Sequence, residues 1–327
     1  MDLADTVTLA LIATAIEPLA GYPQGLFRAI GHPVTWLGLL IALADRSLNN
    51  EAHSFAARRA MGAMALILLL LAAAAAASLL SALLSALALP QPLGLALTAL
   101  IASSLIAQQS LDTHVRAVAI ALGKGMHEGR DAVATIVGRD VAGLDAAGVA
   151  RAAIESLAES FCDGVAAPVF WLAIGGLPGG VCYKAINTAD SMIGHRMKRY
   201  AAFGFAAAKL DDIVNFFPAR LAAMWIVIAA FFTRGASAKE SWRIMRRDSR
   251  GHPSPNAGWP EAAFAGALGV RLGGPRSYGG VNLGDVWIGS GNDASANDIR
   301  RALVLYRHAC GVHWLALALA ALAIAQA

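Results

Sequence analysis

The stretch MGAMALILLLLAAAAAASLLSALLSALALPQPLGLALTALIASSLIAQQSL, Met61–Leu111, contains no Asp, Glu, Lys or Arg. A helix needs about 20 predominantly apolar residues to cross the hydrocarbon core of a bilayer, and this stretch is long enough for two such helices. The Pro90-Gln91-Pro92 turn divides it, because proline interrupts the interior of a helix. We therefore expect a helical hairpin in the membrane, with arms over 61–89 and 93–109.

The composition of the whole chain is also that of a helical membrane protein. Hydrophobic residues make up 57% of the 327 residues and charged residues only 15%, whereas a soluble domain has about 45–50% apolar and about 25% charged residues. The net charge of +4 is modest, and the basic residues flank apolar segments, which is typical of membrane orientation rather than of nucleic-acid binding. We expect an all-α, polytopic membrane protein without a nucleic-acid partner.

Further apolar segments lie on both sides of the hairpin, and together with it they predict one membrane domain over 1–327. The segment 164–182 contains Gly175-Gly176 and Pro178. Broken backbone at membrane depth persists only where protein or water satisfies it, so we expect this segment to be buried or re-entrant. The other expected membrane segments are 6–16, 33–44, 213–232 and 311–325, and the polar regions between segments are 112–163, 183–212 and 234–310.

The distribution of basic residues predicts the orientation in the inner membrane of the cell. The turn at Pro90-Gln91-Pro92 carries no positive charge and is expected on the periplasmic side, which returns Asp112 to the cytoplasm. Basic residues follow both 164–182 and 213–232, so full crossings by both segments would conflict with this rule. We expect the polar regions to share the cytoplasmic face, where the active site would lie.

Four polar residues follow one another at steps of four ahead of the 164–182 segment: Arg151, Glu155, Glu159 and Asp163. Side chains at this spacing lie on one helical ridge, so three carboxylates repel one another unless a cation lies among them. Carboxylates commonly hold Mg²⁺ together with substrate phosphates. The alternative is a solvated helix face with an Arg151–Glu155 ion pair. The place of Asp163 directly before an apolar segment favours a metal site.

A second polar group follows the same apolar segment. Lysine binds phosphate as a point charge, and Asn and Asp side chains can share a cation, so Lys184, Asn187 and Asp190 are binding candidates, with Thr188 beside them. His195 is a candidate general base, because a histidine can exchange a proton near neutral pH. The basic residues that come next are explained by contact with lipid headgroups: Arg196, Lys198 and Arg199.

Two further groups complete the candidates. Asp211-Asp212 stands at the mouth of the 213–232 segment, where it either caps a helix or binds a cation, and Arg220 lies inside that segment, where an ionisable group indicates function. Asn256 and Glu261 lie in a loop that Pro255 and Pro260 make rigid. The alternative for this loop is a turn ahead of a helix with Glu261 in its first turn. The sequence contains no GxxxxGK[ST] phosphate loop.

At these positions the chain resembles the adenosylcobinamide-phosphate synthases, membrane enzymes of cobalamin biosynthesis, over essentially its whole length. The N-terminal part departs from that family's pattern, since Gly21-Tyr22-Pro23 lacks the usual Asp and Gly125–Arg130 replaces the usual Gly-Asp element. The matching motifs are His32-Pro33-Val34, Gly138-Arg139-Asp140, Glu155-Ser156, Asp163, Ala167-Pro168, Tyr183–Thr188, Asp190-Ser191-Met192, Gly194, Phe203-Gly204, Leu210-Asp211-Asp212, Asn215, Pro218-Ala219-Arg220, Pro255–Gly258, Pro260-Glu261-Ala262 and Leu268–Gly274.

The resemblance implies ATP-dependent amide-bond formation between adenosylcobyric acid and (R)-1-amino-2-propanol or its O-phosphate, with Mg²⁺, in the lipid bilayer and alongside other proteins of the same pathway. Proton transfer and catalysis fall to His195, Glu261 and Lys184. Candidates for substrate or phosphate binding are Arg139, Lys184, Asn187, Thr188, Arg220 and Asn256. Candidates for the metal are Asp140, Glu155, Glu159, Asp163, Asp190, Asp211 and Asp212.

A transporter, or a corrinoid-binding membrane protein without catalytic activity, is the alternative class. Helices broken by Gly and Pro next to buried charges, as over 164–220, are also typical of transporters. Two features favour the enzyme: the sequence shows no inverted halves, and its polar residues gather in loops rather than at mid-membrane.

Overall fold

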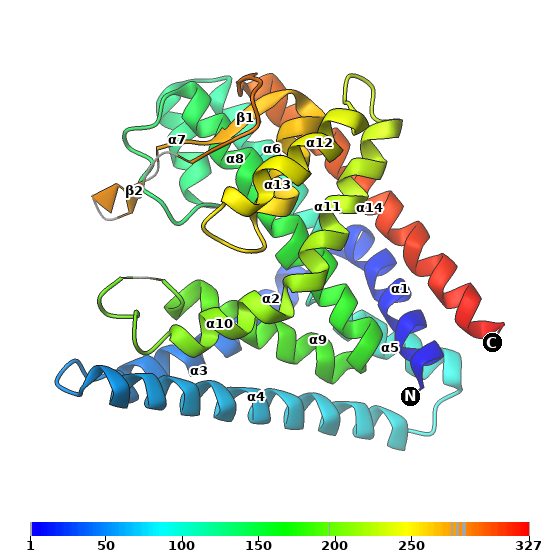
Figure 1. The fold of residues 1–327 in the computed structure, drawn as a ribbon. Coiled ribbons are helices and arrows are strands. Elements are labelled where there is room, and N and C mark those ends of the chain that lie inside the picture. The colour runs from blue at the N-terminus through cyan, green and yellow to red at the C-terminus, as the bar shows by residue number, and fades with distance from the viewer. Residues whose placement is uncertain (1, 196, 276, 279–280, 283–285, 327) are drawn as a thin grey trace. The chain divides into compact units, whose positions relative to one another are not determined.

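The structure is a computed structural model that describes residues 2–326 except 196, 276, 279–280 and 283–285. The described chain is mainly α-helical, with short strands only between Val270 and Asp293 (Figure 1). Among the described residues, six helical stretches are long and apolar enough to cross a membrane, or seven if the bent pair Phe205–Val214 and Phe216–Phe232 forms one span: Leu3–Ala20, Gly25–Leu48, Phe55–Ala86, Gln91–Leu122, Ala146–Ile193 and Ala296–Ala325. These findings confirm the predicted class, an all-α polytopic membrane protein.

The described chain forms two compact units by its internal contacts. Unit 1 comprises Met1–Ala107, Ala167–Asn215 and Leu317–Ala327, and unit 2 comprises Gln108–Ala166 and Phe216–Ala316. The helices of unit 1 are α1 (Leu3–Ala20), α2 (Gln24–Ile30), α3 (Pro33–Leu48), α4 (Phe55–Ala86), α5 (Gln91–Ser103), α9 (Ala167–Ile193) and α10 (Phe205–Val214).

Local sequence explains where the first helices of unit 1 begin and end. The His32 ring accepts a hydrogen bond from the Val34 N–H at 3.2 Å, and the Thr35 hydroxyl accepts one from the His32 N–H at 3.1 Å, so the His32-Pro33-Val34 motif is an N-terminal cap of α3. α1 continues past the expected segment 6–16 to Ala20, because its buried Glu17 stays within the helix.

The predicted hairpin is present as α4 and α5, separated at Pro90. Helix α4 begins at Phe55, ahead of the expected 61, and α5 ends at Ser103, ahead of the expected 109. At the end of α5, the hydroxyls of Ser103 and Ser104 bond to carbonyls three residues back. These bonds compete with the continuing helix, as serine side chains do, so α5 alone is shorter than a membrane crossing.

Helix α9 packs beside α3, α4 and α10, and their apolar residues form the core of unit 1 (Figure 1). The backbone is non-helical at Gly176, with φ of 58°, and Pro178 follows, so the expected Gly/Pro break of 164–182 is a kink that divides α9 into two helical pieces, the second of which ends at Ile193. Core residues from these helices include Leu37, Ile41, Leu66, Leu69, Ala185, Ala189 and Ile193.

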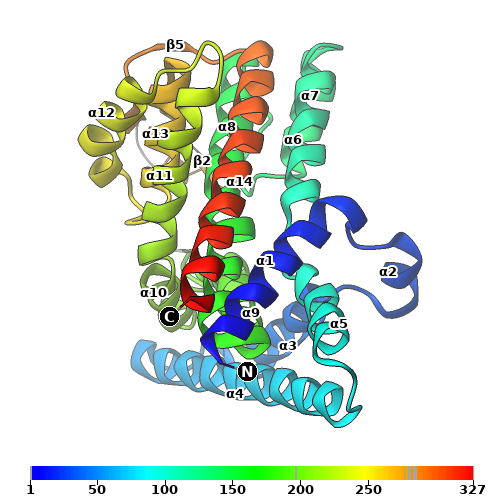
Figure 2. The ribbon, with the colours of Figure 1, turned by 90° about the vertical axis from the view of Figure 1, so that its right-hand side faces the viewer.

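Unit 2 is made of helices with two small sheets. Figure 2 shows α11, α12 and α13 next to one another, and each of these helices contacts the other two. The helical elements are α6 (Gln108–Leu122), α7 (Met126–Ala134), α8 (Ala146–Phe161), a π-helix (Cys162–Ala166), α11 (Phe216–Phe232), α12 (Ala238–Asp248), a 3₁₀ turn (Ser249–Gly251), α13 (Gly258–Leu268) and α14 (Ala296–Ala325).

The strands of unit 2 lie between α13 and α14. β1 (Val270–Gly273) pairs antiparallel with β4 (Trp287–Ile288) and parallel with β5 (Asn292–Asp293), while β2 (Ser277–Tyr278) and β3 (Val281–Asn282) form an antiparallel pair. The hydrophobic pattern of the sequence did not predict these strands, because each is only two to four residues long.

Helix α14 is much longer than the expected segment 311–325. It begins at Ala296, where the Ser295 N–H and hydroxyl bond to the Asp298 carboxylate at 3.0 and 2.6 Å. A search of the sequence for apolar segments does not find the first half of this helix, because that half is polar. Phe161 lies in T-shaped contact with Tyr306 of α14 and Trp225 of α11, with ring centroids 5.6 and 6.5 Å apart, so α8, α11 and α14 share one aromatic core.

Candidate functional site

In unit 1, four polar side chains from α9, α10 and the residue after α10 form one hydrogen-bonded group, the Asp211 cluster (Tyr183, Asn187, Asp211 and Asn215). The Asp211 carboxylate accepts from Asn215 Nδ2 at 3.0 Å and from Asn187 Nδ2 at 3.4 Å. The buried Tyr183 hydroxyl donates to Asn215 Oδ1 at 3.0 Å. This bond fixes which end of the Asn215 amide faces Asp211, so the carboxylate is oriented by neutral donors.

The predicted binding residues of α9 lie on one face of the helix, because Asn187, Thr188 and Ser191 lie three, four and seven residues after Lys184. The Thr188 hydroxyl donates to the Lys184 carbonyl at 2.6 Å, and the Ser191 hydroxyl donates to the Asn187 carbonyl at 2.9 Å. Both hydroxyls thus bond to their own helix. Substrate binding by this face stays a prediction.

Glycines at the end of α9 explain two of the matching motifs. A Cβ atom at Gly194 would lie 1.9 Å from Asp190 Oδ1, and one at Gly204 would lie 1.6 Å from the Ile193 carbonyl oxygen. A Cβ at Gly62 of α4 would come within 1.9 Å of the Phe203 carbonyl oxygen. The Phe203-Gly204 backbone therefore lies in close contact with both α4 and the end of α9.

His195 and Asp212 lie outside the hydrogen bonds of the Asp211 cluster. His195 is exposed in the bend after α9 and makes no hydrogen bond or ion pair within the described part of the chain. Asp212 is half-buried and pairs with Lys209 at 3.0 Å. The structure thus brings together Asn187 and Asp211 from the predicted set, and it adds Tyr183, to which the sequence analysis gave no role.

In unit 2, a buried ion pair joins α8 to the loop before it and to strand β1. Arg139 Nη2 lies 2.6 Å from Glu155 Oε2, and only 7% of each side chain is exposed. The Gly273 N–H donates to the other oxygen of Glu155. A buried carboxylate needs such partners, and this one uses a guanidinium and a backbone donor. The sequence analysis gave an Arg151–Glu155 ion pair as the alternative to a metal site. In the structure, Arg151 pairs instead with Asp293 at 3.4 Å.

The remaining carboxylates of the predicted ridge lie where α8 becomes a π-helix. Glu159 is exposed near the end of α8, and Asp163 is half-buried in the π-helix Cys162–Ala166. A π-helix has i→i+5 hydrogen bonds and often occurs at functional sites. It also ends the regular four-residue ridge that the sequence predicted, so Asp163 is displaced from the line of Glu155 and Glu159. Asp140 is exposed in the loop beside Arg139.

The third predicted group places Arg220 of α11 against the loop before α13. Arg220 Nη1 donates to Asn256 Oδ1 at 3.1 Å, and its guanidinium lies over the rings of Phe216 at 3.6 Å and Trp259 at 4.7 Å. Arginine recognises planar anions well, so this half-buried guanidinium, whose orientation these contacts fix, is a candidate anion site. The structure therefore brings the predicted Arg220 and Asn256 together.

His252 is a residue that the sequence analysis missed. Its Nδ1 accepts from the Ser254 N–H at 3.0 Å, and its Nε2 lies 3.6 Å from the buried Glu261 carboxylate. The Ser254 hydroxyl in turn accepts from the Asn256 N–H at 3.2 Å. A chain of contacts thus runs from Glu261 to Asn256. The loop was noted, but nothing in its spacing identified His252 as the partner of Glu261.

The described residues contain no group of three or more His, Cys, Asp or Glu side chains close enough to hold a metal ion. Mg²⁺ is, however, usually bound by one or two carboxylates together with waters and substrate phosphates. Glu159 and Asp163 of unit 2, and Asp211 of unit 1, suit that mode of binding. The metal assignments of the other carboxylates stay predictions.

Fold and site together define a polytopic helical membrane protein with a polar cluster in each of its two units. The family model described as CobD/Cbib protein matches residues 10–306, and this chain belongs to that family of cobalamin biosynthesis proteins. No solved structure matches it.

Relatives with the name cobalamin biosynthesis protein CobD are similar over nearly their whole length. The one from Sinorhizobium sp is 45% identical over 315 residues, which cover 95% of this chain and 97% of that protein. The one from Rhizobium meliloti (strain 1021) is 43% identical over 323 residues, 98% of each chain. One from Rhodobacter capsulatus is 44% identical over 304 residues, 92% of this chain and 93% of that protein.

Proposed function

We propose that this protein joins adenosylcobyric acid to (R)-1-amino-2-propanol or its O-phosphate by ATP-dependent formation of an amide bond, which gives adenosylcobinamide or its phosphate. The observation that carries this proposal is the 45% identity to a cobalamin biosynthesis protein over 95% of the chain. The hydrogen-bonded grouping of Asn187 with Asp211, and of Arg220 with Asn256, supports it.

The chemistry explains why a site of this kind needs many charged and amide groups. A carboxylate is a poor acyl donor, so ATP transfers its terminal phosphoryl group to the corrinoid carboxylate, with release of ADP. The amine then attacks the acyl phosphate, the amide C–N bond forms, and phosphate leaves as the amine loses a proton. In phosphoryl transfer, the protein contributes mainly positioning and neutralisation of charge.

We assign binding of the anionic groups to Arg220 and Lys184, and acceptance of the amine proton to Glu261. Glu261 is buried beside His252, whose Nε2 lies 3.6 Å from the carboxylate and whose Nδ1 lies 3.0 Å from the Ser254 backbone nitrogen. His252 is thus a positioning residue for Glu261 and for Asn256. Mg²⁺, held by Glu159 and Asp163, would neutralise phosphate charge when bound.

The test uses the purified full chain in detergent with adenosylcobyric acid, the amine and Mg-ATP, and detects the corrinoid product by mass spectrometry. A product heavier by the amine minus water supports the proposal, and reactions without ATP, or with the free amine in place of its phosphate, identify the co-substrates. Asp163→Asn should reduce product formation by about tenfold or more, whereas Asp131→Asn, an exposed carboxylate of α7, should not. Corrinoid binding without amide product in every reaction would contradict it.

We also propose that the protein lies in the inner membrane with its active site in the cytoplasm. The composition of six helical stretches supports a membrane location. A cysteine placed at exposed Asp131 should resist an impermeant thiol reagent in intact cells and react after permeabilisation. Cys162 and Cys310 are buried and Cys182 is half-buried, and each is removed for this measurement. Labelling in intact cells would contradict the orientation.

A further inference from the structure

Helix α11 of unit 2 has a continuous apolar face that stays partly exposed, from 36% at Met224 to 75% at Phe231. Small residues on its inner side, such as Ala222 and Ala223, are fully buried. The outer side is formed at steps of three and four by Leu221, Met224, Ile228 and Phe231, and ends with Phe232. Phe231 and Phe232 are 75% and 71% exposed. An uninterrupted exposed apolar patch of this kind marks contact with a membrane or a partner.

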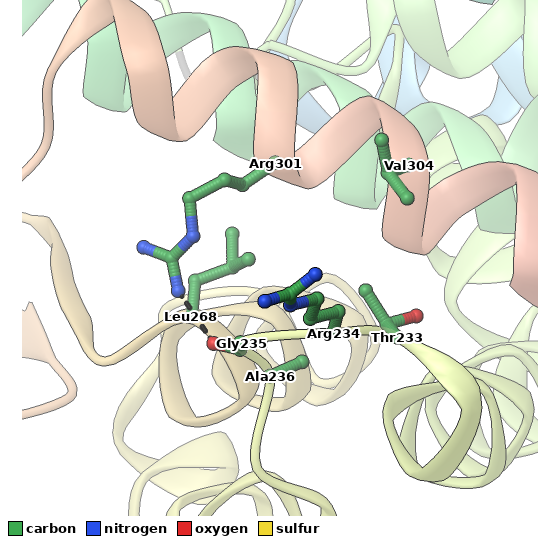
Figure 3. A pocket seen from close by; sticks show the side chains of 7 residues that line it. All are labelled: Thr233, Arg234, Gly235, Ala236, Leu268, Arg301 and Val304. Atoms are coloured by element: carbon green, nitrogen blue, oxygen red, sulfur yellow. Dashed lines mark hydrogen bonds between the residues drawn. The ribbon is translucent and has the colours of Figure 1, made fainter.

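A small cavity is lined in part by the loop that follows this helix (Figure 3). Its volume is about 80 Å³, and its lining contains two arginines and no acidic side chain. The lining comes from the loop after α11, the end of α13 and the first half of α14: Thr233, Arg234, Gly235, Ala236, Leu268, Arg301 and Val304. The cavity is therefore a small, positively charged site next to an apolar surface.

Hydrogen bonds hold one of the two arginines and the loop in place. Arg301 Nη2 donates to the Gly235 carbonyl at 2.8 Å, and its Nη1 lies 2.7 Å from Asp298 Oδ1. The Thr233 hydroxyl bonds to His308 of α14 at 2.7 Å. Arg234 is exposed and has no hydrogen bond or ion pair among the residues that the structure describes. One guanidinium is thus preorganised, and the second is available for a ligand.

We propose that this cavity binds the phosphate of an anionic phospholipid, whose acyl chains lie along the outer face of α11. Arginine binds phosphate oxygens through charge-assisted hydrogen bonds, and basic pockets next to membrane helices bind anionic headgroups. The apolar face ends at Phe232 and the cationic loop begins at Thr233, so the chain places an acyl surface and a phosphate site in the order that a lipid requires. The lipid site does not depend on the proposed amide-forming reaction.

The experiment measures retention of phosphatidylglycerol by the full chain in mixed micelles with phosphatidylcholine, using native mass spectrometry. Arg234→Gln should weaken the apparent affinity for phosphatidylglycerol about fivefold, the effect expected for one basic group at a membrane surface. Arg300→Gln removes the same charge from an exposed neighbour of Arg301 outside the cavity and should change the affinity by less than about twofold. Equal losses of affinity in the two variants would show that the arginines act only through diffuse electrostatic attraction. That result would overturn the proposal.

Two further experiments distinguish binding of the lipid from binding of free phosphate. Inorganic phosphate in large molar excess should leave phosphatidylglycerol bound, because the acyl chains also contribute to binding. Displacement of phosphatidylglycerol by inorganic phosphate would show that the cavity binds a free anion, and it would overturn the proposal of a lipid site. Phe231→Ser should weaken phosphatidylglycerol binding without creating phosphate binding, and unchanged retention would contradict the role of the apolar face. The thermal unfolding midpoint of each variant verifies that it is folded.

Discussion

The carboxylates of Glu155 in unit 2 and Asp211 in unit 1 are held by different chemistry. Glu155 is buried, and its charge is neutralised by the Arg139 guanidinium, with a further donor from the Gly273 backbone. Asp211 is half-buried, and its hydrogen bonds come from the neutral amides of Asn187 and Asn215. The hydrogen bonds of Asp211 therefore hold its carboxylate through amide groups, whereas the negative charge of Glu155 is paired with an arginine within the fold.

We infer from this difference that Glu155 has a mainly structural role and that Asp211 is the better candidate for a functional one. The difference predicts that changes at Glu155 act mainly on stability, and that changes at Asp211 act mainly on activity. The Glu155 pair fastens α8 to strand β1, because its oxygens contact the loop before α8 and the first strand. The metal role predicted for Glu155 is therefore weaker than that of Glu159 or Asp163.

The largest effect should come from breaking the buried pair. Glu155→Gln leaves the Arg139 guanidinium buried without its counter-ion, which should reduce the free energy of unfolding by about 3–5 kcal/mol. The measurement is denaturant unfolding in detergent followed by tryptophan fluorescence. Arg151→Gln is the matched control, since it breaks the more exposed pair with Asp293 and should have a far smaller effect. Equal stability losses would remove the distinction between the two pairs.

Unit 1 should be more sensitive to its backbone contacts than to its carboxylates. Gly204→Ala places a Cβ atom 1.6 Å from the Ile193 carbonyl oxygen, so α9 has to shift at a cost of about 1–3 kcal/mol. The control is Gly175→Ala in α9, where a Cβ meets no atom within 4 Å. The thermal unfolding midpoint should fall for the first variant alone. A stable Gly204→Ala protein would show that the motif glycine has another role.

Much of this architecture is predictable from the sequence, because membrane helices have a strong local signal. The charge-free run Met61–Leu111 identified the hairpin, and Gly176 with Pro178 identified the kink of α9. The polar half of α14 was missed, because it carries Asp298, Arg300 and Arg301 and is stabilised by a cap rather than by apolar residues.

Pairings inside the site are less predictable, because they join residues that are distant in the chain. Arg139–Glu155 and Asn187–Asp211 are 16 and 24 residues apart, and Gly273 reaches Glu155 across 118 residues. The spacing of four between Arg151 and Glu155 suggested a local pair instead. Motif membership selected the candidate site residues, whereas only the fold shows which carboxylate is paired with an arginine.

A third prediction tests the role of Asp211 in activity. Asp211→Asn keeps an oxygen that can accept from Asn187 or Asn215, so the free energy of unfolding should change by about 1 kcal/mol or less. Loss of the negative charge should nevertheless reduce product formation by on the order of tenfold or more. Asp131→Asn, which removes an exposed carboxylate of α7, controls for loss of a surface carboxylate. Full activity with unchanged stability would remove Asp211 from the site.

The smallest expected effect concerns a partly exposed version of the Arg139–Glu155–Gly273 arrangement. At the end of α12, Asp248 lies beside Arg247 and accepts the Gly289 N–H at 2.7 Å. The hydrogen bond from Arg247 lowers the pKa of the Asp248 carboxyl, with a further contribution from the Gly289 N–H. Solvent reaches this pair, so its contribution to stability should be smaller than that of the buried pair.

The direction of the pH dependence follows from the lowered pKa. The folded protein holds the Asp248 proton less tightly than the unfolded chain, so the stabilisation is present above the ordinary Asp pKa of about 3.9 and is lost as pH falls through the lower folded value. Unfolding midpoints measured from neutral pH to about pH 3 should show an acid-induced decrease that is smaller in Asp248→Asn than in the unmodified protein. Parallel curves for the two proteins would mean that this pair, unlike the buried one, does not fasten its helix to the sheet.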